Sequence, residues 1–123
     1  MKWIILIGDE NFDLNTIKDV EHDNCTACYD VEKIKNRYCV EFDKDYIFYD
    51  YITDTDEFAE VLNQIPFRNP HFVMMTYKDE KRVLHILGQE NFPKNIYVDN
   101  DYGRIGPVSD FVNQGAIYAD LTV

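Results

Sequence analysis

Residues 37–51 constrain the fold more than any other stretch, and they read Arg-Tyr-Cys-Val-Glu-Phe-Asp-Lys-Asp-Tyr-Ile-Phe-Tyr-Asp-Tyr. Apolar and polar side chains alternate on both sides of Asp43-Lys44-Asp45, which is typical of two β-strands joined by a turn. A similar alternation over residues 26–34, followed by a turn at Lys35-Asn36, indicates a preceding strand. The pattern therefore predicts a three-stranded meander from about residue 26 to residue 52.

The turn length decides which side chains of this hairpin face the core. A tight two-residue turn would direct three cross-strand pairs inward: Phe42 with Ile47, Val40 with Tyr49, and Tyr38 with Tyr51. The other face would then carry Glu41, Asp43, Tyr46, Phe48 and Asp50. A three-residue turn would instead shift the register by one residue and turn Tyr46 and Phe48 inward.

The first half of the chain contains one further strand and two expected helices. The continuous apolar run from Trp3 to Ile7 predicts a strand covered on both faces. Asp13 can cap a short helix whose apolar residues repeat at helical spacing. A second helix is predicted over residues 53–65, with Thr53 as its cap and Pro66 as its end. Its buried stripe would be Phe58, Val61, Leu62 and Ile65.

The second half predicts mostly strands. Residues 71–77 and 82–87 have the pattern of a hairpin, and residues 96–98 of a short strand. A last short helix would begin near Pro107 and end at Gly115, and a strand would follow over residues 116–121. The sum predicts an α+β fold: one domain over residues 1–123, with a mostly antiparallel sheet of about six to seven strands and two or three short helices.

The net charge of −11 is unevenly distributed along the chain. Residues 1–60 contain 16 acidic and 6 basic side chains, whereas residues 61–123 contain 7 and 6. Nucleic-acid binding requires clustered Lys and Arg, so we expect no nucleic-acid partner. A one-sided negative field can steer a basic protein, although acidity can also serve solubility alone.

Location is inferred from the apolar run and the cysteines. The run at the N-terminal end is too short to span a bilayer and is followed at once by Asp9 and Glu10, so we expect no membrane association. Three cysteines, an odd number, fit a reducing cytoplasm better than a disulfide framework. We therefore expect a cytoplasmic protein.

Two chemical alternatives stay open. His22, Cys25, Cys28 and Cys39 provide four possible ligands for a tetrahedral structural zinc ion, although only one close cysteine pair is present. His71 and His85, both on predicted strands, could act as general bases beside a carboxylate. No nucleophile or phosphate-binding arrangement accompanies them, so we expect a protein that is not an enzyme and that holds no cofactor.

The hairpin and the residues after it combine carboxylates with aromatic rings, a composition favoured at protein interfaces. The predicted contact residues are Glu41, Asp43, Asp45, Asp50, Asp54 and Asp56, with Tyr46, Phe48 and Tyr49 as aromatic anchors. These features favour a small binding protein or inhibitor. The specific hypothesis is an immunity protein that occludes the basic active site of a nuclease-type toxin.

Overall fold

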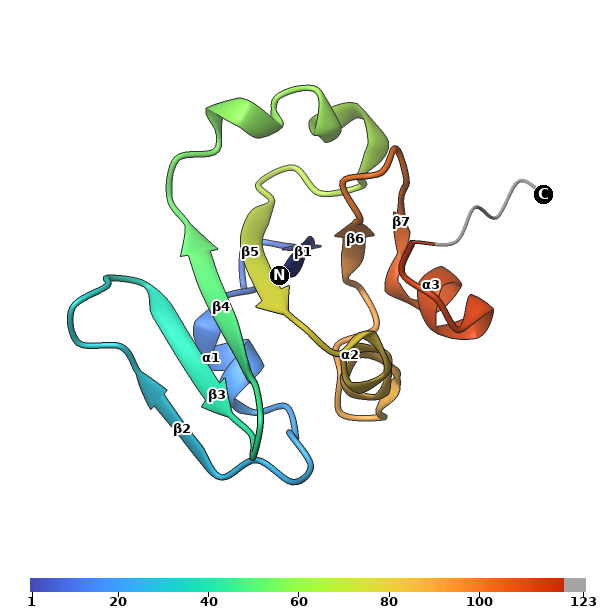
Figure 1. Cartoon of the computed structure of the whole chain (residues 1–123). Coiled ribbons are helices and arrows are strands. Elements are labelled where there is room, and N and C mark those ends of the chain that lie inside the picture. Colours follow the sequence, from blue (N-terminus) through green and yellow to red (C-terminus); the bar gives the residue numbers. More distant parts are fainter. Residues whose placement is uncertain (119–123) are drawn as a thin grey trace.

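The computed structural model describes residues 1–118 and contains one seven-stranded antiparallel sheet with three α-helices (Figure 1). The strand order is β2-β3-β4-β5-β1-β6-β7. The predicted α+β class and single small domain are confirmed. None of the described helices is of a length and hydrophobicity that would carry the chain through a bilayer.

The described elements are short. The strands are β1 (Lys2–Gly8), β2 (Ala27–Asp30), β3 (Arg37–Glu41), β4 (Tyr46–Ile52), β5 (His71–Tyr77), β6 (Tyr97–Asp99) and β7 (Ile105–Pro107). The α-helices are α1 (Leu14–Lys18), α2 (Glu80–Gly88) and α3 (Val108–Gln114), and two 3-10 helices are η1 (Asp56–Phe58) and η2 (Val61–Gln64).

Strand β1 lies inside the sheet, between β5 and β6, and most of its apolar residues are buried on both faces. Its pairing with β5 runs from Lys2 opposite Tyr77 to Gly8 opposite His71. Residues 4–7 are almost completely buried. The continuous apolar run predicted this position.

The main hydrophobic core lies between one face of the sheet and the three α-helices. Asp13 caps α1 by accepting hydrogen bonds from the backbone N–H groups of Asn15 and Thr16. Asp79 caps the N-terminus of α2 in the same way. At the other end of a helix, Gly115 ends α3 in the left-handed conformation, with a φ of 75°. These caps satisfy backbone groups that a helix leaves unpaired at its ends. The predicted last helix is confirmed.

A smaller core lies on the opposite face, where residues 53–70 cross only part of the sheet (Figure 1). Phe58 stacks on Phe72 with ring centroids 4.6 Å apart, above Ile5 and Ile7. This cover begins where β4 ends. Residues 53–70 therefore do not cover the part of that face formed by β2, β3 and most of β4.

The predicted helix over residues 53–65 is wrong. The segment forms only the 3-10 helices η1 and η2, and Thr53 caps neither of them. Phe58 and Ile65 pack on the smaller core, but Leu62 is 46% exposed. The four apolar residues therefore do not form one buried stripe.

The predicted strand over residues 82–87, which included His85, is also wrong. These residues lie in α2, whose buried side consists of Val83, Ile86 and Leu87. That i, i+3, i+4 spacing is helical and follows an N-cap aspartate, so packing of this stripe on the sheet outweighs β pairing. The predicted last strand extends outside the described residues, and its described part, 116–118, forms no strand.

Candidate functional site

The meander is confirmed, and the hairpin turn comprises only Asp43 and Lys44. The backbone N–H of Phe42 donates to the carbonyl of Asp45 over 2.8 Å. Val40 consequently pairs with Ile47, and Tyr38 pairs with Tyr49. The predicted pairs are therefore displaced by two residues, but a shift of two keeps every side chain on its predicted face.

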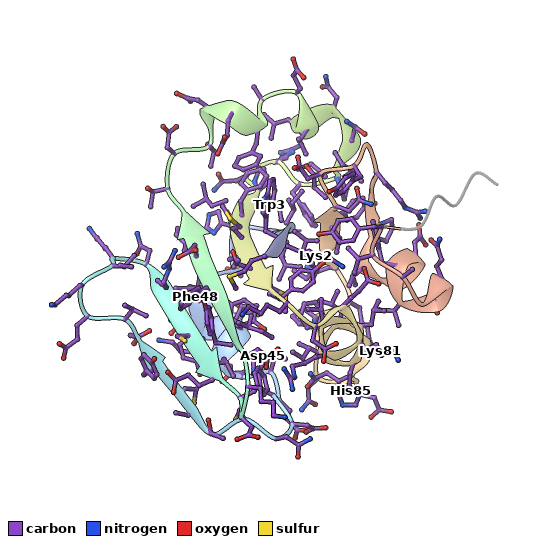
Figure 2. The ribbon with its side chains drawn as sticks, in the orientation of Figure 1. Lys2, Trp3, Asp45, Phe48, Lys81 and His85 are labelled. Atoms are coloured by element: carbon purple, nitrogen blue, oxygen red, sulfur yellow. The ribbon has the colours of Figure 1, made fainter. Side chains whose placement is uncertain are left out.

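The uncovered part of the sheet presents a row of side chains across five strands. Direct cross-strand pairs join Tyr29 to Cys39, Cys39 to Phe48, Phe48 to Thr76, and Thr76 to Trp3. We call this surface, with the adjacent Arg37 and Tyr46, the open face. Figure 2 labels Trp3 near the centre of the sheet and Phe48 over β3 and β4.

Aromatic side chains of the open face lie outside both hydrophobic cores. Trp3 is 37% exposed and Tyr29 is 43% exposed. The rings of Tyr46 and Phe48 are 4.6 Å apart, and the guanidinium of Arg37 lies 4.5 Å from the Phe48 centroid. Sequence reasoning missed Trp3, because it treated the whole run from residue 3 to residue 7 as covered on both faces.

Two of the predicted contact carboxylates are already engaged inside the molecule. The carboxylate oxygens of Asp50 accept hydrogen bonds from Nε and Nη2 of Arg37, with nitrogen–oxygen distances of 2.6 and 3.1 Å. Asp45 faces the helix-bearing side and forms an ion pair with Arg82 of α2. Their charges are therefore compensated locally, and the predicted acidic set is not one continuous patch.

Other predicted carboxylates are more available. Asp43, Asp54 and Asp56 are exposed and form no ion pair with any residue from 1 to 118. Glu41 accepts a hydrogen bond of 2.7 Å from the Tyr29 hydroxyl. Asp43 lies at one end of β4, and residues 54–60 begin at its other end. The unpaired charges therefore border the open face at two separate places.

Tyr49, predicted as an anchor, belongs to the core. It is 1% exposed, and its hydroxyl lies 2.7 Å from Nε2 of His22. Nδ1 of His22 lies 3.1 Å from the Val20 carbonyl, which can only accept. Nδ1 therefore donates, and Nε2 accepts from Tyr49. Burial lowers the pKa of His22, which favours this neutral form.

The four candidate zinc ligands do not converge. Cys28 pairs with Val40, whereas Cys39 pairs with Tyr29, so the two side chains point to opposite faces of β2 and β3. Cys39 is buried on the open-face side, and His22 is engaged by Tyr49. No group of three or more possible metal ligands occurs among residues 1–118. The zinc hypothesis is therefore withdrawn.

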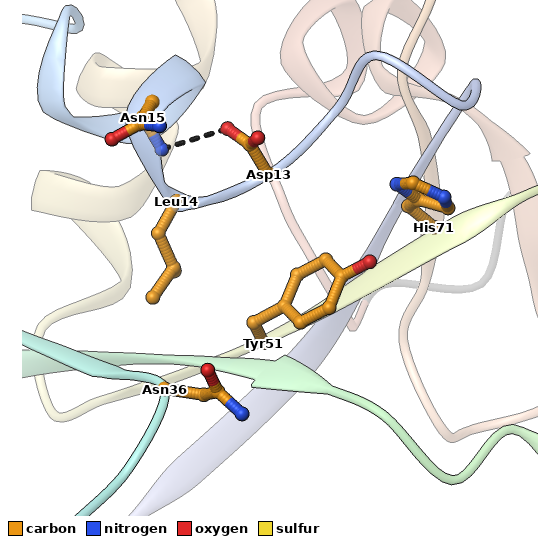
Figure 3. Close-up of a pocket in the computed structure, with 6 residues that line it drawn as sticks. All are labelled: Asp13, Leu14, Asn15, Asn36, Tyr51 and His71. Atoms are coloured by element: carbon orange, nitrogen blue, oxygen red, sulfur yellow. Dashed lines mark hydrogen bonds between the residues drawn. The ribbon is translucent and has the colours of Figure 1, made fainter.

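The two candidate histidines are not cross-strand neighbours. His85 lies on the exposed side of α2, where its Nε2 is 2.9 Å from a carboxylate oxygen of Asp23. His71 begins β5 and lines a hollow with Asp13 and Tyr51 (Figure 3). None of the residues from 1 to 118 that line this hollow is a Ser, Thr or Cys that could act as a nucleophile.

No family model, curated protein or solved structure is significantly similar to this chain.

Proposed function

We propose that this chain is an acidic cytoplasmic binding protein that inhibits a basic protein partner by covering its active site, as an immunity protein does with a nuclease-type toxin. The observation that carries the proposal is the open face, where Trp3, Tyr46 and Phe48 lie outside both cores. Large aromatic side chains outside a core are typical centres of protein interfaces.

Charge supports a basic partner rather than a neutral one. The chain carries a net charge of −11. Asp43, Asp54 and Asp56 border the open face without compensating cations from the described residues. Carboxylates at the rim of an interface accelerate association with a positively charged cleft. The aromatic residues would then supply affinity, and the rim carboxylates would supply association rate and selectivity.

The test is coexpression with the product of the neighbouring gene, followed by measurement of complex formation and of that product's nuclease activity. We expect a 1:1 complex without nuclease activity. Trp3→Ala and Phe48→Ala should each weaken binding by roughly 30-fold, the equivalent of about 2 kcal/mol. The double change Asp54→Asn, Asp56→Asn should instead slow association and flatten its salt dependence.

Glu90→Gln is the control, because Glu90 is exposed and follows α2, away from the open face. It removes one negative charge and should leave binding unchanged. A complex that keeps full nuclease activity would rule out occlusion. Affinity that survives both aromatic substitutions would rule out the open face as the contact surface.

A further inference from the structure

The hollow beside His71 is lined by polar side chains, several atoms of which have no hydrogen-bond partner among residues 1–118. It has a volume of about 270 Å³ and is lined by Asp13, Leu14, Asn15, Asn36, Tyr51 and His71 (Figure 3). Drug-sized ligands occupy pockets of roughly 300–1,000 Å³, so this hollow suits a small head group. It lies on the helix-bearing side of the sheet, opposite the open face, and is independent of the function proposed above.

The lining contains hydrogen-bond acceptors that no described residue uses. Asp13 uses Oδ1 to cap α1, at 2.8 Å from the N–H of Asn15. Nδ1 of His71 is 2.9 Å from the Phe12 carbonyl, so it donates, and in the neutral ring Nε2 keeps its lone pair. No residue from 1 to 118 forms a hydrogen bond with Oδ2 of Asp13, Nε2 of His71 or the hydroxyl group of Tyr51.

The charge and the aromatic wall select the kind of ligand. Among the described residues of the lining, Asp13 is the only carboxylate, and none is Lys or Arg. The Tyr51 ring stands edge-on to His71, with centroids 5.8 Å apart, and forms one wall of the hollow. The amide side chains of Asn15 and Asn36 each add one acceptor oxygen and one NH2 donor group.

We propose that this hollow binds a guanidinium group. Guanidinium presents five N–H donors in a plane and no acceptor, which complements the carboxylate and the other unused acceptors of the lining. It is also weakly hydrated and stacks on aromatic rings, whereas an ammonium ion is compact and strongly hydrated. The group could belong to a free small molecule or to an arginine side chain, and the probes below separate these sources.

The experiment titrates the ¹⁵N-labelled protein with N-acetyl-L-arginine amide and follows the backbone amides of the lining residues by NMR. N-acetyl-L-citrulline amide is the matched probe, because it has nearly the same shape without the charge. We expect saturable shifts with the arginine probe and at least tenfold weaker binding of the citrulline probe. Agmatine carries the same guanidinium group without the peptide groups, so it separates the two sources: tighter binding of agmatine indicates a small molecule, and tighter binding of the blocked arginine indicates a side chain.

Asp13→Asn removes the charge but keeps a residue that caps helices well, so α1 should remain folded. It should weaken the arginine probe at least tenfold, and Tyr51→Phe should weaken it less. Asp19→Asn is the control, since it removes an exposed charge at the other end of α1. Equal affinity for arginine and citrulline probes, no saturable shift, or equal effects of the two aspartate substitutions would overturn the proposal.

Discussion

Arg82 on α2 forms an ion pair with Asp45, the residue before β4, and its guanidinium lies 3.8 Å from the centroid of the Phe42 ring. The pair joins the hairpin turn to the helix that follows β5. Asp45 is only 14% exposed and Arg82 27% exposed, so neither charge is well solvated. An aspartate that looked like a contact residue therefore has a structural role.

Removal of this ion pair should destabilise the protein measurably. Arg82→Met keeps much of the aliphatic stem but leaves Asp45 unpaired, so we expect a loss of about 1–3 kcal/mol in the free energy of unfolding. Chemical denaturation of both single variants and the double variant with Asp45→Asn gives the coupling energy. A coupling near zero would show that the contact contributes nothing.

Truncation of two tyrosines of β4 should destabilise the protein to very different extents. Tyr49→Ala empties a buried site and should cost about 3–5 kcal/mol. Tyr46→Ala removes a half-exposed ring of the open face and should cost less than about 1.5 kcal/mol. Thermal unfolding of the two variants checks this. Similar losses would mean that the open face is part of the folded core.

The environment of His22 should make stability depend on pH. Burial lowers the pKa of folded His22 below its usual 6.5, so the unfolded chain binds the proton more readily. The neutral form stabilises the fold fully above pH 6.5, and this stabilisation is lost as the pH falls through the folded-state pKa. His22→Gln should therefore lose less stability than the wild type between pH 7.5 and pH 5.5 in parallel thermal melts. Identical pH profiles would contradict this origin.

The three thiols should differ in reactivity. Cys25 and Cys28 are exposed, whereas Cys39 is 2% exposed and burial raises the pKa of its thiol. Because the thiolate is the reactive species, we expect a disulfide reagent to modify two thiols rapidly in the native protein and the third only on unfolding. Zinc should not slow these reactions. Protection of Cys25 and Cys28 by zinc would revive a metal site there.

The sequence predicted the structure well in segments whose hydrophobic pattern is compatible with only one type of secondary structure. The alternation through residues 37–51 predicted which side chains lie on each face of the hairpin. This was possible because successive side chains of a strand point to opposite faces, whatever their cross-strand partners are. The exact partners of Val40 and Tyr38 depended on turn geometry and were displaced by two residues. The continuous run of β1 correctly indicated an interior strand.

The failures have different causes. Phe58, Val61, Leu62 and Ile65 have helical spacing, but this segment covers only a small apolar area above Phe72 and forms 3-10 helices instead. The signal for α2 was present, since Asp79 precedes residues 83, 86 and 87 at helical spacing. The hairpin interpretation gave more weight to the β-forming residues of this stretch than to the cap.

The candidate sites were harder to anticipate than the fold. Arg82 and Asp45 are far apart in the sequence, so nothing local indicated that Asp45 would be neutralised. The hollow beside His71 combines residues from the start of α1, the turn before β3, the end of β4 and the start of β5. Such a combination depends on tertiary packing and leaves no pattern in any one segment.

The interior position of β1 also sets an order of assembly. β1 ends at Gly8, but its partner β5 begins at His71 and its partner β6 begins at Tyr97. During synthesis at about 5–20 residues per second, the most apolar strand therefore waits of the order of 10 s before both neighbours exist. Contacts between such distant segments also slow folding. The meander of β2 to β4 can form first, and closure around β1 completes the sheet.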